Sequence, residues 1–81
     1  MGVKAYVLIT TIMGSEYEVL EDLIKMAGPD VSIQVDVVYG VYDLVVVVEV
    51  SDLSSLDRVV TNIRRHPKVT KTVTLISSTA R

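Results

Sequence analysis

The segment 44–50, Leu-Val-Val-Val-Val-Glu-Val, most constrains how this 81-residue chain can fold. Successive side chains of a β-strand point to opposite faces of its sheet, and only one residue of this segment is polar. A strand covered on one face would alternate apolar and polar residues, so this strand needs cover on both faces. The two helices predicted below cover one face. We expect a second copy of the protein to cover the other face.

Three further segments predict strands. Residues 4–11 and 69–76 have the length and the β-branched content of strands. Residues 31–38 begin by alternating apolar and polar side chains, which predicts a half-exposed strand at the edge of a sheet. The connection 39–42 is short, so this edge strand and the segment 44–50 are predicted to form an antiparallel hairpin.

The first helix is predicted to begin at a capping box and to end at a glycine-proline pair. Ser15 is followed three residues later by Glu18, the spacing at which hydroxyl and carboxylate cap a helix reciprocally. Gly28 and Pro29 are residues that end helices. Four apolar residues at helical spacing predict the buried stripe: Leu20, Leu23, Ile24 and Ala27.

The second helix is predicted to follow the capping residues Ser51 and Asp52 and to end before Pro67. Cationic side chains in its last turn suit the negative end of the helix dipole. Its predicted buried stripe consists of Leu56, Val59, Val60 and Ile63.

The element order strand-helix-strand occurs twice along the chain. This repeat predicts an α+β fold of the ferredoxin-like type. This βαββαβ sandwich is a four-stranded antiparallel sheet with both helices on one face. We expect residues 1–81 to form a single domain. Its other face is apolar and self-complementary, so a two-fold dimer that packs sheet against sheet, an assembly of the dimeric α+β-barrel type, is predicted.

The composition excludes several kinds of site. Eight basic residues against ten acidic ones give a net charge of −2, which argues against direct nucleic-acid binding. Without cysteine and with a single histidine, the chain lacks the ligand clusters of a metal site, and no cofactor motif is present. The sequence shows neither a membrane-length apolar stretch nor a signal peptide, so we expect a cytoplasmic protein.

The hairpin residues 39–43 are the first candidate binding site. Asp43 either meets an ammonium group of a ligand or caps the turn at Gly40, as aspartate side chains often do. Gly40 supplies a positive φ or a close backbone approach, which suits both interpretations. Tyr39 and Tyr42 flank the turn and are expected to wall a pocket.

A second candidate site lies on the last predicted strand, where Thr70, Thr72 and Thr74 alternate with other residues. Their hydroxyls, predicted to line one face, could bind a carboxylate or an α-amino group. Threonine is also a good strand former, and cross-strand threonine contacts are common, so a structural role stays open.

The remaining polar features offer little for catalysis. His66, beside Pro67, is predicted to be a surface residue that complements the helix dipole rather than a general base. No nucleophile elbow or carboxylate pair is present, so we predict no catalytic residue and no enzyme. A small basic cluster could attract an acidic partner or simply be solvated: Arg64, Arg65, Lys68 and Lys71.

From residue 5 to residue 76 the chain resembles the effector-binding domain, or RAM domain, of the Lrp/AsnC family of leucine- and asparagine-responsive regulators. The most specific mark is the glycine-x-tyrosine-aspartate-leucine segment at 40–44. The other marks are the segment 5–9, Gly14, the pair 52–53 and the segments 66–69 and 72–76.

The resemblance implies a ferredoxin-like domain that dimerises sheet to sheet, with four dimers commonly closing into an octameric ring. It also implies that an amino acid binds where dimers meet. The hairpin would form one side of that pocket, and the last strand would supply hydroxyls. The ligand-binding residues predicted in this way are Tyr39, Gly40, Tyr42, Asp43, Thr72 and Thr74.

Full-length family members carry a helix-turn-helix domain for which 81 residues leave no room, so the chain resembles the stand-alone form. We expect an amino-acid sensor that influences transcription or amino-acid metabolism by assembling with itself or with full-length regulators. Two alternatives stay open. One is a purely structural interaction module, and the other is a small dimeric α+β-barrel enzyme with a site between sheet and helices.

Overall fold

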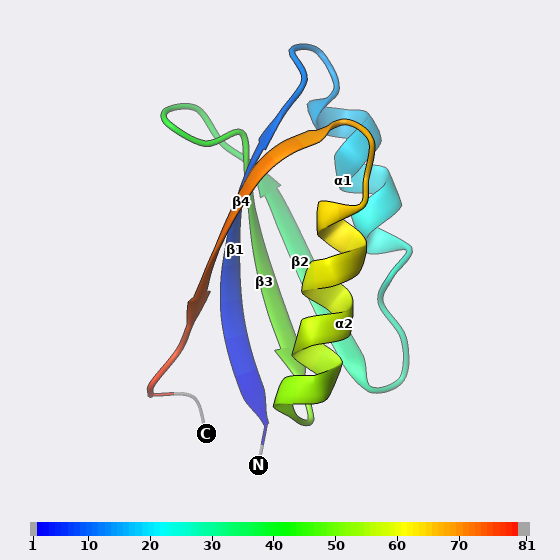
Figure 1. Cartoon of the computed structure of the whole chain (residues 1–81), viewed down its shortest axis with the longest axis vertical. Coiled ribbons are helices and arrows are strands. Elements are labelled where there is room, and N and C mark those ends of the chain that lie inside the picture. Colours follow the sequence, from blue (N-terminus) through cyan, green and yellow to red (C-terminus); the bar gives the residue numbers. More distant parts are fainter. Residues whose placement is uncertain (1, 80–81) are drawn as a thin grey trace.

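Four antiparallel strands and two helices follow one another in the order β-α-β-β-α-β. The structure, a computed structural model, describes residues 2–79. The strands form one sheet in the order β2-β3-β1-β4, and both helices lie on the same face of it (Figure 1). This is the predicted ferredoxin-like α+β fold. Its elements are β1 (Val3–Thr11), α1 (Glu16–Ile24), β2 (Val31–Val37), β3 (Leu44–Val50), α2 (Leu53–Arg64) and β4 (Val69–Ile76).

The core fills the layer between the sheet and the helices. Alternate residues of β1 and β3 point into it, and each helix contributes a short aliphatic stripe. Burial of one such side chain stabilises the fold by about 1.5–3 kcal/mol. The buried hydrophobic residues are Ala5, Val7, Ile9, Val19, Leu23, Leu44, Val46, Val48, Val50, Leu56, Val59 and Ile63.

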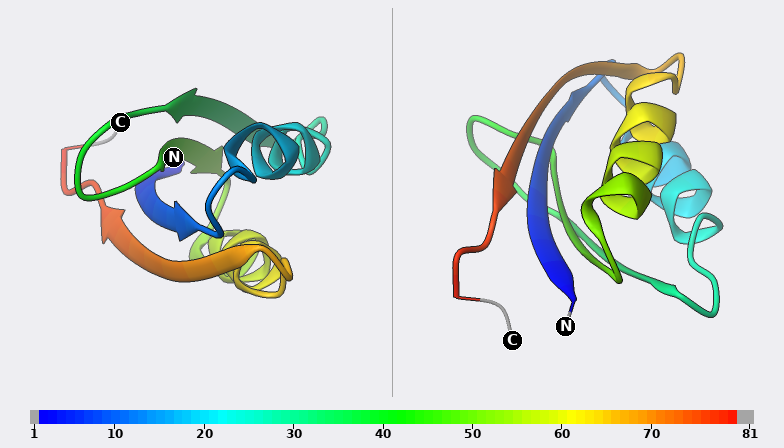
Figure 2. Two further views of the ribbon diagram at one scale, coloured as in Figure 1. Left: turned by 90° about the horizontal axis from the view of Figure 1, so that it is seen from above. Right: turned by 60° about the horizontal axis from the view of Figure 1, so that its bottom comes forward.

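The opposite face of the sheet is apolar at its centre and is not covered by a helix (Figure 2). The strand register places Tyr6 between Val47 and Leu75 in one row across this face. The next row consists of Val45, Leu8 and Val73. We call these six residues the open sheet face. Strand β3 is therefore apolar on both faces as predicted, while the described part of the chain covers only one of them.

Strand β2 lies at the edge of the sheet, as its alternation predicts. Its polar residues are exposed, whereas its apolar residues pack against the core from the edge. The residues that pack in this way are Val31, Ile33, Val35 and Val37.

The predicted capping box at the start of α1 is wrong. Ser15 is the N-cap residue, but its side chain makes no capping hydrogen bond, and its φ of −102° and ψ of 6° depart from the extended geometry of a cap. Glu18 instead accepts a hydrogen bond from Lys68 Nζ at 2.8 Å. The backbone N–H of Ser15, which Glu18 would accept in a capping box, donates instead to the carbonyl of Ile12 at 3.0 Å.

The buried stripe of α1 also differs from the prediction. Val19 and Leu23 are the buried residues of this helix, whereas Ile24 is 48% exposed. The helix ends at Ile24, so Ala27 lies beyond it, and Gly28 does not terminate it. Gly28 instead donates its N–H to the carbonyl of Val31 at 3.0 Å. The α1–β2 connection therefore begins earlier than the glycine-proline pair predicts.

Helix α2 agrees with the prediction at its start and along its core face. The Asp52 carboxylate accepts a hydrogen bond from the backbone N–H of Ser55 at 2.8 Å. The backbone and side-chain hydrogen bonds from Ser55 hold the pKa of Asp52 below its ordinary value of 3.8. Leu56, Val59 and Ile63 are buried against the sheet.

Candidate ligand-binding site

The connection between β2 and β3, which we call the hairpin loop (residues 38–43), projects beyond the end of the sheet. Seen from above, it extends toward the side away from the helices (Figure 2). Gly40 has a φ of +140°, a conformation that favours glycine. At the tip, Tyr39 is 99% exposed and Val41 is 85% exposed. The tip therefore presents two uncovered apolar side chains, whereas Tyr42 is half-buried.

Asp43 fastens the hairpin loop to β1. Its Oδ2 accepts a hydrogen bond from the backbone N–H of Thr11 at 2.8 Å, and its own N–H donates to the carbonyl of Ile9 at 2.9 Å. The carboxylate thus bonds a neighbouring strand and not the turn at Gly40. Within residues 2–79 its second oxygen, Oδ1, accepts no hydrogen bond, which leaves it available to a ligand.

The threonines of β4 do not act as one set. The register pairs Thr72 with Ile9 and Thr74 with Val7, which places both threonines on the helix side of the sheet. The register shifts between Thr10 and Thr11, and the Thr70 hydroxyl is held at 2.7 Å from the hydroxyl of Thr10. The Thr70 hydroxyl is therefore held by Thr10, unlike the hydroxyls of Thr72 and Thr74, because the strand is irregular there.

An open groove of about 590 Å³ runs between α2 and β4. Thr72 and Thr74 line it, and within residues 2–79 neither hydroxyl is engaged by another side chain. The groove combines aliphatic side chains, hydroxyls and cations, which suits a small ligand that carries an anionic group. We call it the α2–β4 groove, and its lining residues are Val60, Arg64, Val69, Thr70, Lys71, Thr72 and Thr74.

The six predicted ligand-binding residues form two separate halves in the described chain. Leu44, Ile9 and Thr72 share one row of the register, so the base of the hairpin loop and Thr72 lie at the same end of the sheet. Strand β1 nevertheless separates them, and the loop projects to the side that the helices leave uncovered. A single copy does not bring the halves into one pocket.

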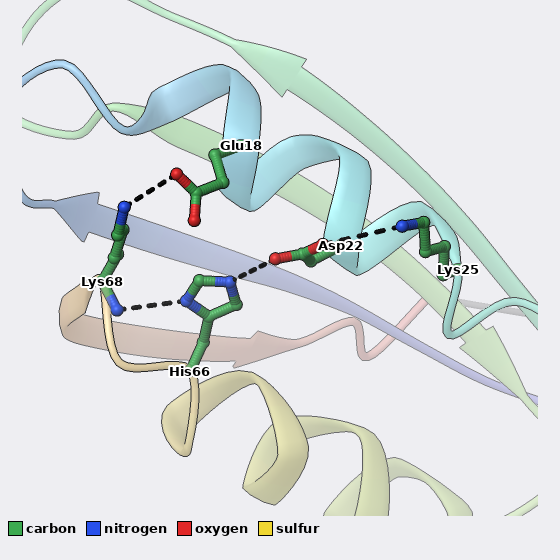
Figure 3. A network of polar contacts seen from close by, with 5 residues as sticks. All are labelled: Glu18, Asp22, Lys25, His66 and Lys68. Atoms are coloured by element: carbon green, nitrogen blue, oxygen red, sulfur yellow. Dashed lines mark hydrogen bonds and ion pairs between the residues drawn. The ribbon is translucent and has the colours of Figure 1, made fainter.

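His66 is not the surface residue that the sequence predicts, because its side chain is only 9% exposed. Its Nδ1 accepts a hydrogen bond from the backbone N–H of Lys68 at 3.1 Å, which assigns the ring proton to Nε2. Nε2 donates to Oδ2 of Asp22 at 2.7 Å (Figure 3). The ring therefore joins α1 to the turn between α2 and β4. His66 and Asp22 are 44 positions apart in the sequence, so local sequence patterns could not predict this contact.

Two ion pairs extend this contact along α1 (Figure 3). Lys68 Nζ lies 2.8 Å from Glu18 Oε1, and Lys25 Nζ lies 3.9 Å from Asp22 Oδ1. These side chains are substantially exposed, so each pair contributes at most about 1 kcal/mol. Lys68 thus leaves the predicted basic cluster, which keeps the exposed residues Arg64, Arg65 and Lys71.

The rest of the described chain offers few groups for catalysis. Ser15 is the one polar residue in the buried set of residues 2–79, so aliphatic side chains fill the layer in which the enzyme alternative places its site. Over the same residues, no three acidic or histidine side chains are grouped to hold a metal ion. Neither described helix has the length and apolarity to cross a membrane.

Comparison with known proteins identifies the family. The family model described as the Lrp/AsnC ligand-binding domain matches residues 4–80. The chain belongs to the Lrp/AsnC ligand-binding domain family. The segment that holds the hairpin loop and the α2–β4 groove lies entirely within this match.

Solved structures of relatives share the fold. The crystal structure of FFRP-DM1 is 43% identical with a TM-score of 0.80, over 93% of this chain and 97% of that one. A protein of Thermus thermophilus is 34% identical with a TM-score of 0.83, over 98% and 96% of the two chains. A feast or famine regulatory protein of M. tuberculosis, solved in complex with L-methionine, is 22% identical with a TM-score of 0.68. The alignment covers 96% of this Lrp/AsnC domain and 51% of that longer chain. No curated protein sequence matches this Lrp/AsnC domain.

Proposed function

We propose that this Lrp/AsnC domain is a single amino-acid-binding and oligomerisation unit, and that it acts by binding rather than by catalysis. The observation that carries the proposal is the match of the ligand-binding family model to residues 4–80. The M. tuberculosis relative, which was solved with L-methionine, supports an amino acid as the class of ligand. Within residues 2–79 the buried set consists of aliphatic residues and Ser15, which supports binding over enzymatic chemistry.

The chemistry of the two halves suits the backbone groups of an amino acid. The free Oδ1 of Asp43 can accept a hydrogen bond from an ammonium group. The hydroxyls of Thr72 and Thr74 can donate to a carboxylate. Gly40 and Tyr42 shape the hairpin loop around the ligand, and the exposed ring of Tyr39 closes over it. Because one copy keeps the halves apart, the complete site requires a second copy.

The open sheet face is the proposed dimer interface. Its apolar residues form two adjacent rows across β3, β1 and β4, and a two-fold axis would place the same rows of a second copy against them. The family resemblance adds that dimers associate further, with four dimers in an octameric ring. Such an assembly supplies the neighbouring copy that the ligand site needs.

Ligand binding would then regulate through assembly. An amino acid shifts the equilibrium between assembled states only as far as it binds one state more tightly than another. We propose that the module, in the cytoplasm, influences transcription or amino-acid metabolism by assembling with itself or with longer family regulators. Contact with DNA is left to those regulators, since residues 2–79 offer only a few exposed cations.

Calorimetric titration of the assembled protein with each of the twenty amino acids tests the proposal. We expect saturable heat with one amino acid or a small chemically related group. Absence of heat with all twenty at millimolar concentration would refute amino-acid sensing and favour a structural interaction module.

A further inference from the structure

The lining of the α2–β4 groove contains cationic side chains and no acidic one. Arg64, in the last turn of α2, and Lys71, on β4, both contribute to it. Both residues are exposed, and neither forms an ion pair within residues 2–79. Lys68, which lies between them in the sequence, is instead bound by Glu18 at 2.8 Å. The groove therefore keeps positive charge that the described chain does not neutralise.

Arg64 is the better placed of these two cations. Lys71 pairs with Thr10 in the register, and the next residue, Thr72, pairs with Ile9, whose side chain is buried in the core. Because successive side chains of a strand point to opposite faces, Thr72 faces the helices and Lys71 leaves from the open side of the sheet. Lys71 thus contributes its charge from the rim at the edge strand β4, whereas Arg64 comes from the helix that forms the opposite wall.

The groove has a definite order along its length. Helix α2 and strand β4 both extend away from the turn that joins them, residues 65–68 (Figure 1). Arg64 lies next to this turn, and Val60 lies about 6 Å further along the helix axis. On the strand, Thr72 lies about 10 Å from Val69. With increasing distance from the turn, the groove therefore presents a guanidinium, then aliphatic side chains and then a hydroxyl.

The helix dipole accounts for only part of this pattern. A cation in the last turn of a helix is favoured by the negative end of the dipole, so a positive charge at Arg64 is explained without any ligand. The dipole does not require the cation to face a groove, and Arg65, the next residue, lies outside the lining. The position of Arg64 beside an aliphatic wall and free hydroxyls suits a carboxylate partner.

We infer that the amino acid bound by this domain is acidic, an aspartate or a glutamate. The inference rests on the proposed function and names the class of its ligand. With the α-carboxylate at Thr72 and Thr74, the side chain of the ligand extends over Val60, and its own carboxylate meets the guanidinium of Arg64. Arginine suits this role because its planar fork binds both oxygens of a carboxylate, and such charge-assisted hydrogen bonds are stronger than neutral ones.

Neutral amino acids satisfy this groove less well. Glutamine and asparagine have nearly the shape of the acidic amino acids but bring no charge to Arg64. Methionine, with which the M. tuberculosis relative was solved, would pack on the aliphatic wall and cover the guanidinium without pairing it. The charge of the ligand side chain is therefore the property by which Arg64 selects.

Calorimetric titration of the assembled protein with glutamate, aspartate, glutamine, asparagine and methionine, all as L-amino acids, tests the inference. We expect one acidic amino acid to bind at least about tenfold more tightly than its amide and than methionine. In Arg64→Gln this preference for acid over amide should fall to within about threefold. Arg58→Gln is the matched control, because Arg58 lies on the same helix but outside the groove, and it should keep the preference. Circular dichroism spectra that match wild type will confirm that each variant is folded.

Three results would overturn the inference. Tighter binding of a neutral amino acid would do so and would leave the proposed function intact. An equal loss of glutamate and glutamine binding in Arg64→Gln would assign the guanidinium to the α-carboxylate that all amino acids share. An equal loss of the preference in Arg58→Gln would indicate a general charge effect. Absence of heat with any amino acid would instead refute the proposed function itself.

Discussion

Individual side chains in this domain join segments that are distant in the sequence. Asp43 connects the hairpin loop to the end of β1, 32 residues earlier. His66 connects the end of α2 to Asp22, 44 residues earlier. Both contacts lie at the end of the sheet where the candidate ligand groups are found. The same residues therefore bear on stability and on the geometry of the site.

Two substitutions of Asp43 separate its structural role from its binding role. Asp43→Ala removes the acceptor for the Thr11 N–H, and we expect the free energy of unfolding to fall by about 1–3 kcal/mol. Asp43→Asn retains an oxygen for that hydrogen bond but loses the charge that faces an ammonium group. Chemical denaturation should therefore leave the asparagine variant near wild type, while calorimetry shows amino-acid binding weakened about tenfold or more. Unaltered binding by Asp43→Asn would assign the residue to structure alone.

His66 is expected to be one of the main polar contributors to stability. His66→Ala leaves the Lys68 N–H and the Asp22 carboxylate without their partner, at a cost of about 1–3 kcal/mol in urea denaturation. Arg65→Ala, an exposed neighbour, should change stability by less than about 0.5 kcal/mol. Equal midpoints for the two variants would contradict a joining role for the ring.

Neither contact could be predicted from the sequence. The glycine-tyrosine-aspartate pattern marks Asp43, but the partner Thr11 follows only from the strand order β3-β1. Likewise, His66 beside Pro67 looks like an ordinary helix end until α1 is placed next to it. The periodicity of a sequence reports which face of an element is buried, and it carries no information about which elements are neighbours.

Among the elements, the start of α2 makes a prediction about pH. Hydrogen bonds from Ser55 hold the pKa of Asp52 below 3.8 in the folded chain, so ionised Asp52 stabilises the fold at neutral pH. That contribution is fully present above about pH 3.8 and is lost as the pH falls through the lower folded pKa. Asp52→Asn retains the cap without the charge.

Thermal denaturation of wild type and Asp52→Asn between pH 7 and pH 2 measures this contribution. The stability advantage of wild type should be constant near neutrality and should shrink below about pH 3.8. An advantage that grows on acidification would contradict the assigned direction of the pKa shift.

Sequence periodicity predicted the strands more accurately than it predicted the first helix. The strands were predictable because alternation and β-branched runs are strong signals, and β2 could be recognised as an edge strand. Helix α1 is only nine residues long, so a stripe drawn from Leu20 instead of Val19 shifts the predicted buried face. Its capping box does not form, because the N–H of Ser15 donates to Ile12 and the Glu18 carboxylate accepts from Lys68, 50 residues further on.

For the whole molecule, the open sheet face predicts a two-fold dimer. Leu8→Lys places a charge in the middle of this face, between Val45 and Val73, and burying it in an interface without a partner is strongly unfavourable. We expect light scattering to show the monomer mass. Gln34→Lys, on the polar β2 edge of the same face, should remain assembled. A dimer that survives Leu8→Lys would place the interface elsewhere.

The proposed division of the ligand site between copies does not follow from the geometry of a single chain. The sequence marks both the hairpin loop and the threonines, but the structure shows that β1 lies between them. The proposed sheet-to-sheet dimer rests on a surface, the open sheet face, and not on a motif. The central claim is that an assembly of several copies, and not the single chain, binds an amino acid.

Native mass spectrometry of the protein with a mixture of the twenty amino acids tests that claim most directly, because one spectrum reports both assembly and bound ligand. We predict oligomers that carry mass increments of one amino acid for each completed site, while free subunits carry none. Oligomers without any such increment, or monomers that bind as well as oligomers, would contradict the account.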